Sequence, residues 1–352
     1  MSDTMVRFDN VNIVFGSDPK EALPLMDEGQ SRSEIQEKTG QVLGVHNCSI
    51  DVQNGEILVL MGLSGSGKST LLRAVNGLNP VVRGSVEVST GNAMVDVVSA
   101  SERELRAIRR ERVAMVFQQF GLLPWRTVLE NVAFGLEVAG MAVEERLEKA
   151  RRQLELVNLD EWADRKVQEL SGGMQQRVGL ARAFATEAPI LLMDEPFSAL
   201  DPLIRNKLQD ELLELQKTLG RTIIFVSHDL DEALKIGNRI AIMEGGRIVQ
   251  CAQPQEIVLD PATDYVAEFV AHMNPLNVLR AVEIMGPYQD GMPQSARHIP
   301  DTTPMKDIIS MLVDEQSDIV VTGDSGPVGL INTKAALKAL LQAQHNASAG
   351  AG

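Results

Sequence analysis

The fold is decided by the stretch Gly62-Leu63-Ser64-Gly65-Ser66-Gly67-Lys68-Ser69, which matches the phosphate-binding pattern G-x-x-x-x-G-K-[ST]. An apolar strand is expected just before it, over Glu56–Met61, and a helix just after it, over Lys68–Asn76. Glycines let backbone N–H groups turn inward around phosphates, and the start of the helix adds positive potential. The flanking strand and helix argue against a chance glycine-rich turn.

Each side chain of this loop has an expected role. We expect Lys68 to reach the β- and γ-phosphates, Ser69 to ligate Mg²⁺ and Thr70 to hydrogen-bond the α-phosphate. The sequence therefore predicts ATP and Mg²⁺ as cofactors. The remaining residues expected to cradle the nucleotide are Gly62, Ser64, Gly65, Ser66 and Gly67.

Two adjacent acids follow a second apolar strand, Ile190–Met193. Asp194, at the strand end, is expected to hold Mg²⁺ through water. Glu195 is expected to polarise the water that attacks the γ-phosphate. An acid pair is more often merely solvated, but this pair follows a buried strand in a chain that already has a phosphate loop.

Strands alternate with helices along the chain, which favours an α/β fold. A charged helical stretch is expected over Asp18–Lys38, closed by Gly40, and Asn54-Gly55 is typical of a two-residue hairpin turn. Further strands are expected over Met5–Phe15, Val42–Val52, Val113–Phe117 and Thr222–Val226. Further helices are expected over Glu102–Arg112, Thr127–Leu156 with a break near Gly140, Ser171–Glu187 and Leu203–Leu219.

Length and composition limit the classes of function. The 352 residues suggest about two domains, and the boundary is expected near Asn274-Pro275. A surplus of 48 Asp and Glu over 33 Lys and Arg, a net charge of −15, argues against nucleic acid as a partner. Cys48 and Cys251 show no metal-ligand spacing. With neither a signal peptide nor a long apolar run, the chain is expected to be neither secreted nor membrane-spanning.

A third glycine turn makes the chain resemble a known family. Leu170-Ser171-Gly172-Gly173-Met174-Gln175-Gln176-Arg177 resembles the signature motif of ATP-binding-cassette (ABC) proteins, with Met174 where many members have Gln. The resemblance implies that Ser171, Gly172, Gly173 and Gln175 bind the ATP held by the other subunit of a homodimer. The alternative is that this serine and the two glycines only cap a helix.

Further family elements fall in the expected order. The resemblance implies that Gln118 senses Mg²⁺, that Asp201 in Ser198–Asp201 lies along the dimer interface, and that His228 contacts the γ-phosphate. It implies catalytic roles for Glu195, His228 and Lys68, and metal ligation by Ser69, Gln118 and Asp194. Phe15 is the candidate to stack on adenine, but it is equally consistent with a plain core residue.

Residues 5 to 272 are also similar to ATPases for glycine betaine, proline betaine and choline uptake, notably in the inserted stretch Glu21–Gly40 and in Leu200–Arg205. This similarity implies a P-loop ABC-type domain with a mixed sheet core, an antiparallel β subdomain and a helical subdomain. It implies an ATP hydrolase on the cytoplasmic face of the inner membrane, peripheral to a transmembrane permease that docks near Gln118–Asn131. A separate substrate-binding protein would deliver choline or betaine.

Two alternatives to this function remain. One is the ATPase of an importer for another small solute, which would share the whole mechanism. The other is a non-transport ATPase acting on nucleic acid or ribosomes, against which the net charge and the single phosphate loop count.

Three parts of the chain are expected: an ATP-binding domain over 1–273, a small α+β regulatory region over 274–345, and a disordered tail over 346–352. In the second part, Pro304–Val313 and Lys334–Leu341 are expected as helices, and Asp318–Val321 and Gly329–Ile331 as strands. This pattern resembles one regulatory module of the cystathionine-β-synthase (CBS) type. A purely structural or dimerising appendage is the alternative.

Overall fold

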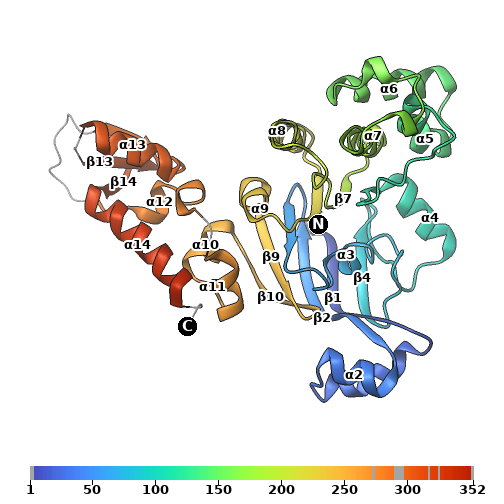
Figure 1. Cartoon of the computed structure of the whole chain (residues 1–352), viewed down its shortest axis with the longest axis horizontal. Coiled ribbons are helices and arrows are strands. Elements are labelled where there is room, and N and C mark those ends of the chain that lie inside the picture. The colour runs from blue at the N-terminus through green and yellow to red at the C-terminus, as the bar shows by residue number, and fades with distance from the viewer. Residues whose placement is uncertain (1–3, 272–273, 289–296, 316–317, 324–325, 350–352) are drawn as a thin grey trace. The chain divides into compact units, whose positions relative to one another are not determined.

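A computed structural model describes residues 4–271, 274–288, 297–315, 318–323 and 326–349 (Figure 1). The chain divides into two compact units. The first consists of Met1–His228 with Met243–Ile248, and the second of Asp229–Ile242 with Val249–Gly352. The predicted α/β class is confirmed, with mixed sheets covered by helices.

A four-stranded antiparallel sheet has the order β2-β1-β4-β5. Its strands are β1 (Thr4–Phe15), β2 (Val42–Gln53), β4 (Arg83–Ser89) and β5 (Met94–Asp96). The predicted hairpin at Asn54-Gly55 is wrong. The chain does turn there, but β2 pairs with β1, whereas β3 (Ile57–Met61) belongs to the other sheet. A turn dipeptide predicts a reversal of the chain and does not predict which strand pairs with which.

The six-stranded sheet has the order β10-β9-β3-β8-β7-β6. Strands β3, β8, β7 and β6 run parallel, and β3, β7 and β8 are buried along their whole length, as a parallel sheet covered on both faces requires. The remaining bounds are β6 (Val113–Val116), β7 (Ile190–Asp194), β8 (Thr222–Val226), β9 (Arg239–Glu244) and β10 (Arg247–Ala252). The carboxyl ends of β3, β7 and β8 therefore meet at one edge.

The predicted helices of the first unit are present, but the one expected over Lys68–Asn76 already ends at Leu72. The interruption expected near Gly140 separates α5 from α6, and α5, α6 and α7 pack on one another (Figure 1). The helices are α3 (Lys68–Leu72), α4 (Glu102–Glu111), α5 (Val128–Val138), α6 (Val143–Leu156), α7 (Gly172–Ala185) and α8 (Pro202–Leu219), with short 3₁₀ turns η2 (Asp160–Trp162) and η3 (Val167–Glu169).

The charged stretch expected as one helix forms η1 (Pro19–Glu21), α1 (Ala22–Asp27) and α2 (Arg32–Thr39). Gly29, at φ 79°, breaks the helical path between α1 and α2. Gly40 ends α2 in the left-handed conformation, as predicted. A small hydrophobic cluster anchors the segment, made of Val14, Ala22, Met26, Ile35 and Leu43.

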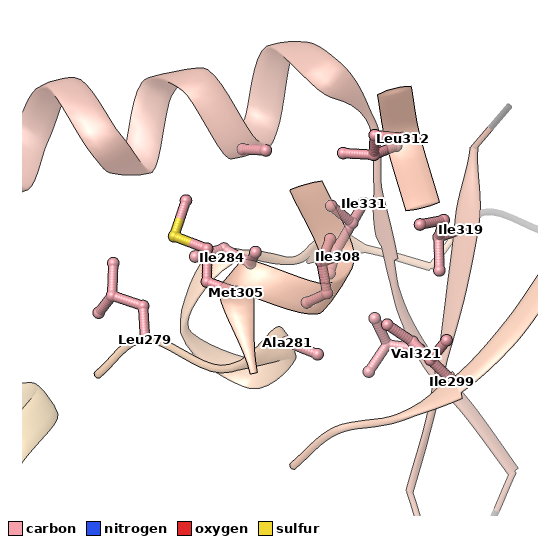
Figure 2. Packing of buried hydrophobic residues seen from close by; sticks show 11 residues of the cluster. Leu279, Ala281, Ile284, Ile299, Met305, Ile308, Leu312, Ile319, Val321 and Ile331 are labelled. Carbon is pink, nitrogen blue, oxygen red and sulfur yellow. The ribbon is translucent and has the colours of Figure 1, made fainter. Parts of the chain in front are cut away.

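The second unit has its own core under a four-stranded sheet of order β11-β14-β13-β12. Figure 2 shows the side chains of this core, including Met305, Ile308 and Ile331, converging between helices and sheet. The strands are β11 (Gly286–Pro287), β12 (Arg297–Pro300), β13 (Ile319–Gly323) and β14 (Gly326–Ile331). The helical elements are α9 (Leu230–Ile236), α10 (Pro254–Leu259), α11 (Asp264–Val270), η4 (Pro275–Asn277), α12 (Ala281–Ile284), α13 (Met305–Glu315) and α14 (Thr333–Ala349).

The chain end differs from expectation. Helix α14 continues to Ala349, whereas composition predicted a disordered tail from Asn346. The tail contains Ala347 and Ala349, and alanine is the strongest helix former, so a helix already under way can extend through it. Residues 350–352 lie outside the described residues.

The core of the second unit yields a stability prediction. Ile308→Ala removes a fully buried side chain, so the free energy of unfolding of this unit should fall by about 2–5 kcal/mol. Val313→Ala, on the exposed face of the same helix α13, should change it by less than about 0.5 kcal/mol. Calorimetry combined with amide exchange of β13 would measure both. Equal effects of the two substitutions would contradict the described packing.

Candidate functional site

The phosphate loop joins β3 to α3 and is held in close contact with the surrounding backbone. At Gly62, φ is 139°, and an added Cβ would lie 2.2 Å from the Met243 carbonyl oxygen. At Gly67, φ is 103°, and an added Cβ would lie 2.5 Å from the carbonyl oxygen of Gly44. Glycine is required at both positions, because any side chain would collide with backbone.

Lys68 is buried, with 6% of its surface exposed. Its ammonium group donates to the carbonyl oxygens of Gly62, at 2.8 Å, and Leu63, at 3.0 Å. Burial lowers the pKa of Lys68, while Glu195 and Asp194 oppose this effect. Within the part of the chain that the structure describes, the buried Ser66 hydroxyl oxygen has no hydrogen-bond partner. The loop thus offers a desolvated cation and an unsatisfied polar atom to a phosphate.

Asp194, at the end of β7, is fully buried. Its carboxylate accepts a hydrogen bond from the Ser69 hydroxyl, at 2.6 Å, and forms an ion pair with Arg73, at 2.8 Å. A hydroxyl beside a carboxylate is an oxygen donor set of the kind that Mg²⁺ prefers, together with phosphate oxygens. Among the described residues no three His, Cys, Asp or Glu side chains are grouped to hold a metal by themselves. The residues therefore fit Mg²⁺ bound jointly with a nucleotide.

Glu195 has a left-handed backbone, with φ of 50°, a conformation that costs a non-glycine residue about 1–3 kcal/mol. Its carbonyl oxygen accepts from Gln176 Nε2, at 3.2 Å, and from the Ser198 hydroxyl, at 3.1 Å, and these bonds hold the conformation. Its side-chain Oε2 accepts from Gln118 Nε2, at 3.1 Å, and lies 3.3 Å from His228 Nδ1. Three residues predicted separately thus meet at one oxygen atom.

A cavity of about 690 Å³ is lined by Lys68, Ser69, Gln118, Glu195 and His228. Asp194 is not in its lining and reaches it only through its hydrogen bond with Ser69. Phe15 lies in its wall with 37% of its surface exposed, against Gly44, where an added Cβ would come within 2.8 Å of the ring. The full lining is Phe15, Arg32, Gln36, Val42, Leu43, Gly44, Ser64, Gly65, Gly67, Lys68, Ser69, Thr70, Gln118, Glu195 and His228. Phe15 is therefore placed at a cavity wall and is not enclosed in the core.

The residues of the signature motif are not brought to this cavity within one chain. Ser171 caps α7 by accepting from the Met174 N–H, at 3.4 Å, and both Ser171 and Gly172 are exposed. Gln175 donates to the Leu170 carbonyl oxygen, at 3.1 Å. None of these three residues lines the cavity, and neither does Gly173. Asp201 is also absent from the lining and instead caps α8.

Three residues that the sequence analysis did not single out support the site. Arg73 pairs with Asp194, and Gln176 bridges the Glu195 carbonyl oxygen and the Ala199 N–H. Arg182 donates to the carbonyl oxygens of Phe120 and Gly121, just after Gln118. Burial lowers the pKa of Arg182. For Gln176 and Arg182 the available signal was a polar residue within the mainly buried helix α7, because a buried polar group needs a partner. Arg73, just after α3, carried no such signal.

None of the helices in the described ranges is both long and apolar enough to cross a bilayer.

Comparison with known proteins identifies the family. The family model described as ABC transporter matches residues 45–198. The chain is 46% identical to the glycine betaine/proline betaine transport ATP-binding protein ProV of Salmonella typhimurium, over 95% of this chain and 82% of that protein. It is 44% identical to the trimethylamine N-oxide transport ATP-binding protein TmoW of Ruegeria pomeroyi, over 97% of this chain and 99% of that protein.

A solved structure agrees with these sequence matches. The ATP-binding cassette MJ0796, in a dimeric post-hydrolysis state bound to ADP and Pi, superposes with a TM-score of 0.62 at 31% identity, covering 71% of this chain and 99% of that one. The chain therefore belongs to the ATP-hydrolysing subunits of ABC transporters, within the subfamily of glycine betaine, proline betaine and trimethylamine N-oxide uptake systems.

Proposed function

We propose that ATP is bound and hydrolysed at the cavity around the phosphate loop, with Glu195 and His228 acting at the γ-phosphate and Phe15 stacking on adenine. The observation that supports this most strongly is the meeting of Gln118, Glu195 and His228 at one carboxylate oxygen, in the cavity that the buried Lys68 also lines. A carboxylate held in this way is positioned to orient a water molecule for attack.

The charge around the phosphates supports the same reaction. Lys68 exchanges its two carbonyl partners for phosphate oxygens and neutralises the charge that develops on them. Ser69, Asp194 and Gln118 would hold Mg²⁺, which would add further neutralising charge. Gln176 keeps the Glu195 backbone in place, so that the carboxylate does not need to reorganise during the reaction.

The site is completed by a second copy of the chain. Ser171, Gly172, Gly173 and Gln175 sit at the start of α7 and do not line the cavity of their own chain. A helix start with an exposed glycine, here Gly172, is suited to bind phosphate presented from outside. These residues would have a ligand in a homodimer, where the signature motif of each chain would bind the ATP held by its partner. Asp201 would then lie at the interface.

A permease would dock beside Gln118. The segment after Gln118 carries Trp125, with 69% of its surface exposed, while buried Asn131 fixes the backbone of Leu123 through two hydrogen bonds. An exposed aromatic residue on a fixed backbone is typical of a protein interface. Arg182 ties this segment to α7, so that a change at the ATP site would reach the permease. Such docking would place the chain at the cytoplasmic face of the inner membrane, with a separate binding protein supplying the solute.

The proposed cargo is a methylated amine, choline or glycine betaine, carried by the permease without contact with this chain. The similarity to the glycine betaine/proline betaine protein ProV supports this class. Trimethylamine N-oxide is a second candidate, because the match to TmoW spans 99% of that protein.

The second unit would regulate the ATPase. Strand β12, helix α13, strands β13 and β14 and helix α14 follow one another as a compact β-α-β-β-α unit, in which β12 and β13 are parallel. This order supports a single CBS-type module within the proposed regulatory region 274–345. A dimerising role is the alternative.

Substitution of the catalytic carboxylate tests the chemistry. Glu195→Gln keeps the shape of the side chain but removes its negative charge, so the hydrolysis rate should fall about 10²–10⁴-fold while ATP affinity is retained. Steady-state ATPase assays and binding of a fluorescent ATP analogue would measure both. Glu148→Gln, the same change on the exposed face of α6, is the control and should leave both unchanged. Full ATPase activity of Glu195→Gln would contradict the proposed role of Glu195 in activating water.

Mixed dimers test whether the site is shared between subunits. Lys68→Ala and Ser171→Arg should each abolish hydrolysis alone, because each spoils both sites of a homodimer. When the two variants are mixed, each heterodimer keeps one site with intact Lys68 and Ser171, so an ATPase rate that neither variant has alone should appear. If the mixture stays as inactive as its components, the shared site is ruled out.

Uptake assays in cells test the cargo. Loss of the gene should abolish uptake of labelled choline or glycine betaine, and wild type, but not Glu195→Gln, should restore it. Labelled trimethylamine N-oxide, measured in parallel, distinguishes the second candidate. Unchanged uptake of all three solutes, in a strain without a redundant system, would leave the ATPase intact and reject this cargo class.

A further inference from the structure

The inserted helix α2 reaches the phosphate loop. Arg32, its first residue, donates from Nη1 to the carbonyl oxygen of Gly65, at 2.8 Å, and from Nη2 to the carbonyl oxygen of Gly44, at 2.7 Å. Gly65 belongs to the phosphate loop and Gly44 to β2. One guanidinium group therefore links an inserted segment, a strand and the phosphate loop.

The position of Arg32 is fixed by the start of its helix. Ser31 accepts from the Glu34 N–H, and the Glu34 carboxylate accepts from the Ser31 N–H, at 2.8 Å, which forms a capping box. One turn further, Ile35 is fully buried in the cluster that anchors the insertion. Because the helix is held at its start and along its face, the Arg32 side chain is held over the loop.

The partners of Arg32 make its role more specific. The hydrogen bonds of its guanidinium go to two backbone carbonyl oxygens, and burial lowers the pKa of Arg32. Two parallel donors in a rigid plane fix distance and angle better than a single ammonium group does. Two charge-assisted hydrogen bonds offset part of the cost of half-burying this charge, and among the described residues its Nε has no hydrogen-bond partner. The two bonds also fix the two backbone segments relative to each other.

Gly44, one of the two partners, lies where several parts of the cavity meet. An added Cβ on Gly44 would come within 2.8 Å of the Phe15 ring and 3.1 Å of Thr70 Cγ2, and the Gly44 carbonyl oxygen closely faces Gly67. The strand segment that Arg32 holds is therefore the one that supports Phe15, at the end of the cavity where the base would lie. Gln36, one turn along α2, lines the same cavity.

We propose that Arg32 is a positioning residue for nucleotide binding, which holds the phosphate loop at a set distance from the wall that carries Phe15. The inserted segment is then part of the ATP site and not an appendage. The inference rests on the proposed function, since it requires ATP to occupy this cavity. It predicts that Arg32 contributes to nucleotide affinity through preorganisation and not to the chemical step.

The test compares affinity with turnover in the full chain. Arg32→Ala should weaken binding of a fluorescent ATP analogue, and raise KM for ATP, by about 10-fold, the effect expected when charge-assisted hydrogen bonds are lost. The value of kcat at saturating ATP should stay within about threefold, because no group at the γ-phosphate changes. Arg32→Lys keeps the positive charge but loses the two separate donors of the guanidinium. Its ATP affinity should therefore lie between that of Arg32→Ala and that of wild type.

The matched control is Asp27→Asn, which weakens the ion pair between α1 of the same insertion and Arg83 without touching the phosphate loop. It should leave ATP affinity unchanged. An equal loss of affinity in Asp27→Asn and Arg32→Ala would overturn the specific role of Arg32 in favour of general docking of the insertion. Affinity of Arg32→Ala within twofold of wild type would also overturn it.

Lys68→Ala separates this inference from the function on which it rests. If Lys68→Ala loses analogue binding while Arg32→Ala keeps it, ATP occupies the proposed cavity and only the role of Arg32 fails. If Lys68→Ala binds the analogue as wild type does, the proposed site fails, and the inference fails with it.

Discussion

The structure depends on one buried carboxylate. Asp194 ends a strand that is buried along its whole length, and a lone charge there would cost several kcal/mol. Ser69 in α3 and Arg73 at its end compensate for that cost. The Ser69 hydroxyl donates to the Asp194 carboxylate at 2.6 Å, and the Arg73 guanidinium forms an ion pair with it at 2.8 Å. The same contacts join β7 to the loop that follows β3, so the groups proposed to bind phosphate and the carboxylate proposed to act on water are held in one frame. Arg32 extends this frame to the insertion.

One chain brings only some of the proposed site residues together. Lys68 and Glu195 line the same cavity and Asp194 is joined to it through Ser69, whereas Ser171 caps a helix and does not line the cavity. This separation suits an enzyme that should hydrolyse ATP only when assembled, because coupling to transport requires that hydrolysis wait for a conformational change. The strained backbone of Glu195, stabilised by Gln176 and Ser198, lies at the centre of this arrangement.

Much of this could be predicted from sequence because the signals were local. The phosphate loop, the acids after Ile190–Met193 and the helix ends at Gly40 and Gly140 depend on neighbouring residues, and the structure places each where expected. Strand pairing is not local, so the Asn54-Gly55 turn predicts a hairpin wrongly, because β2 and β3 lie in different sheets. Supporting contacts were missed for the same reason: Arg32 and Gly65 are 33 residues apart, and Arg73 and Asp194 are 121 apart. No spacing pattern marks such pairs.

The most direct test of the account is whether one chain holds only half of a working ATP site. Light scattering on the Glu195→Gln variant, with and without saturating Mg-ATP, measures whether two chains associate around ATP and requires neither transport nor turnover. If each ATP site is shared between two chains, Mg-ATP should shift the mass from that of one chain, 38.4 kDa, to that of two. A chain that binds Mg-ATP fully and remains a monomer at high concentration would contradict it.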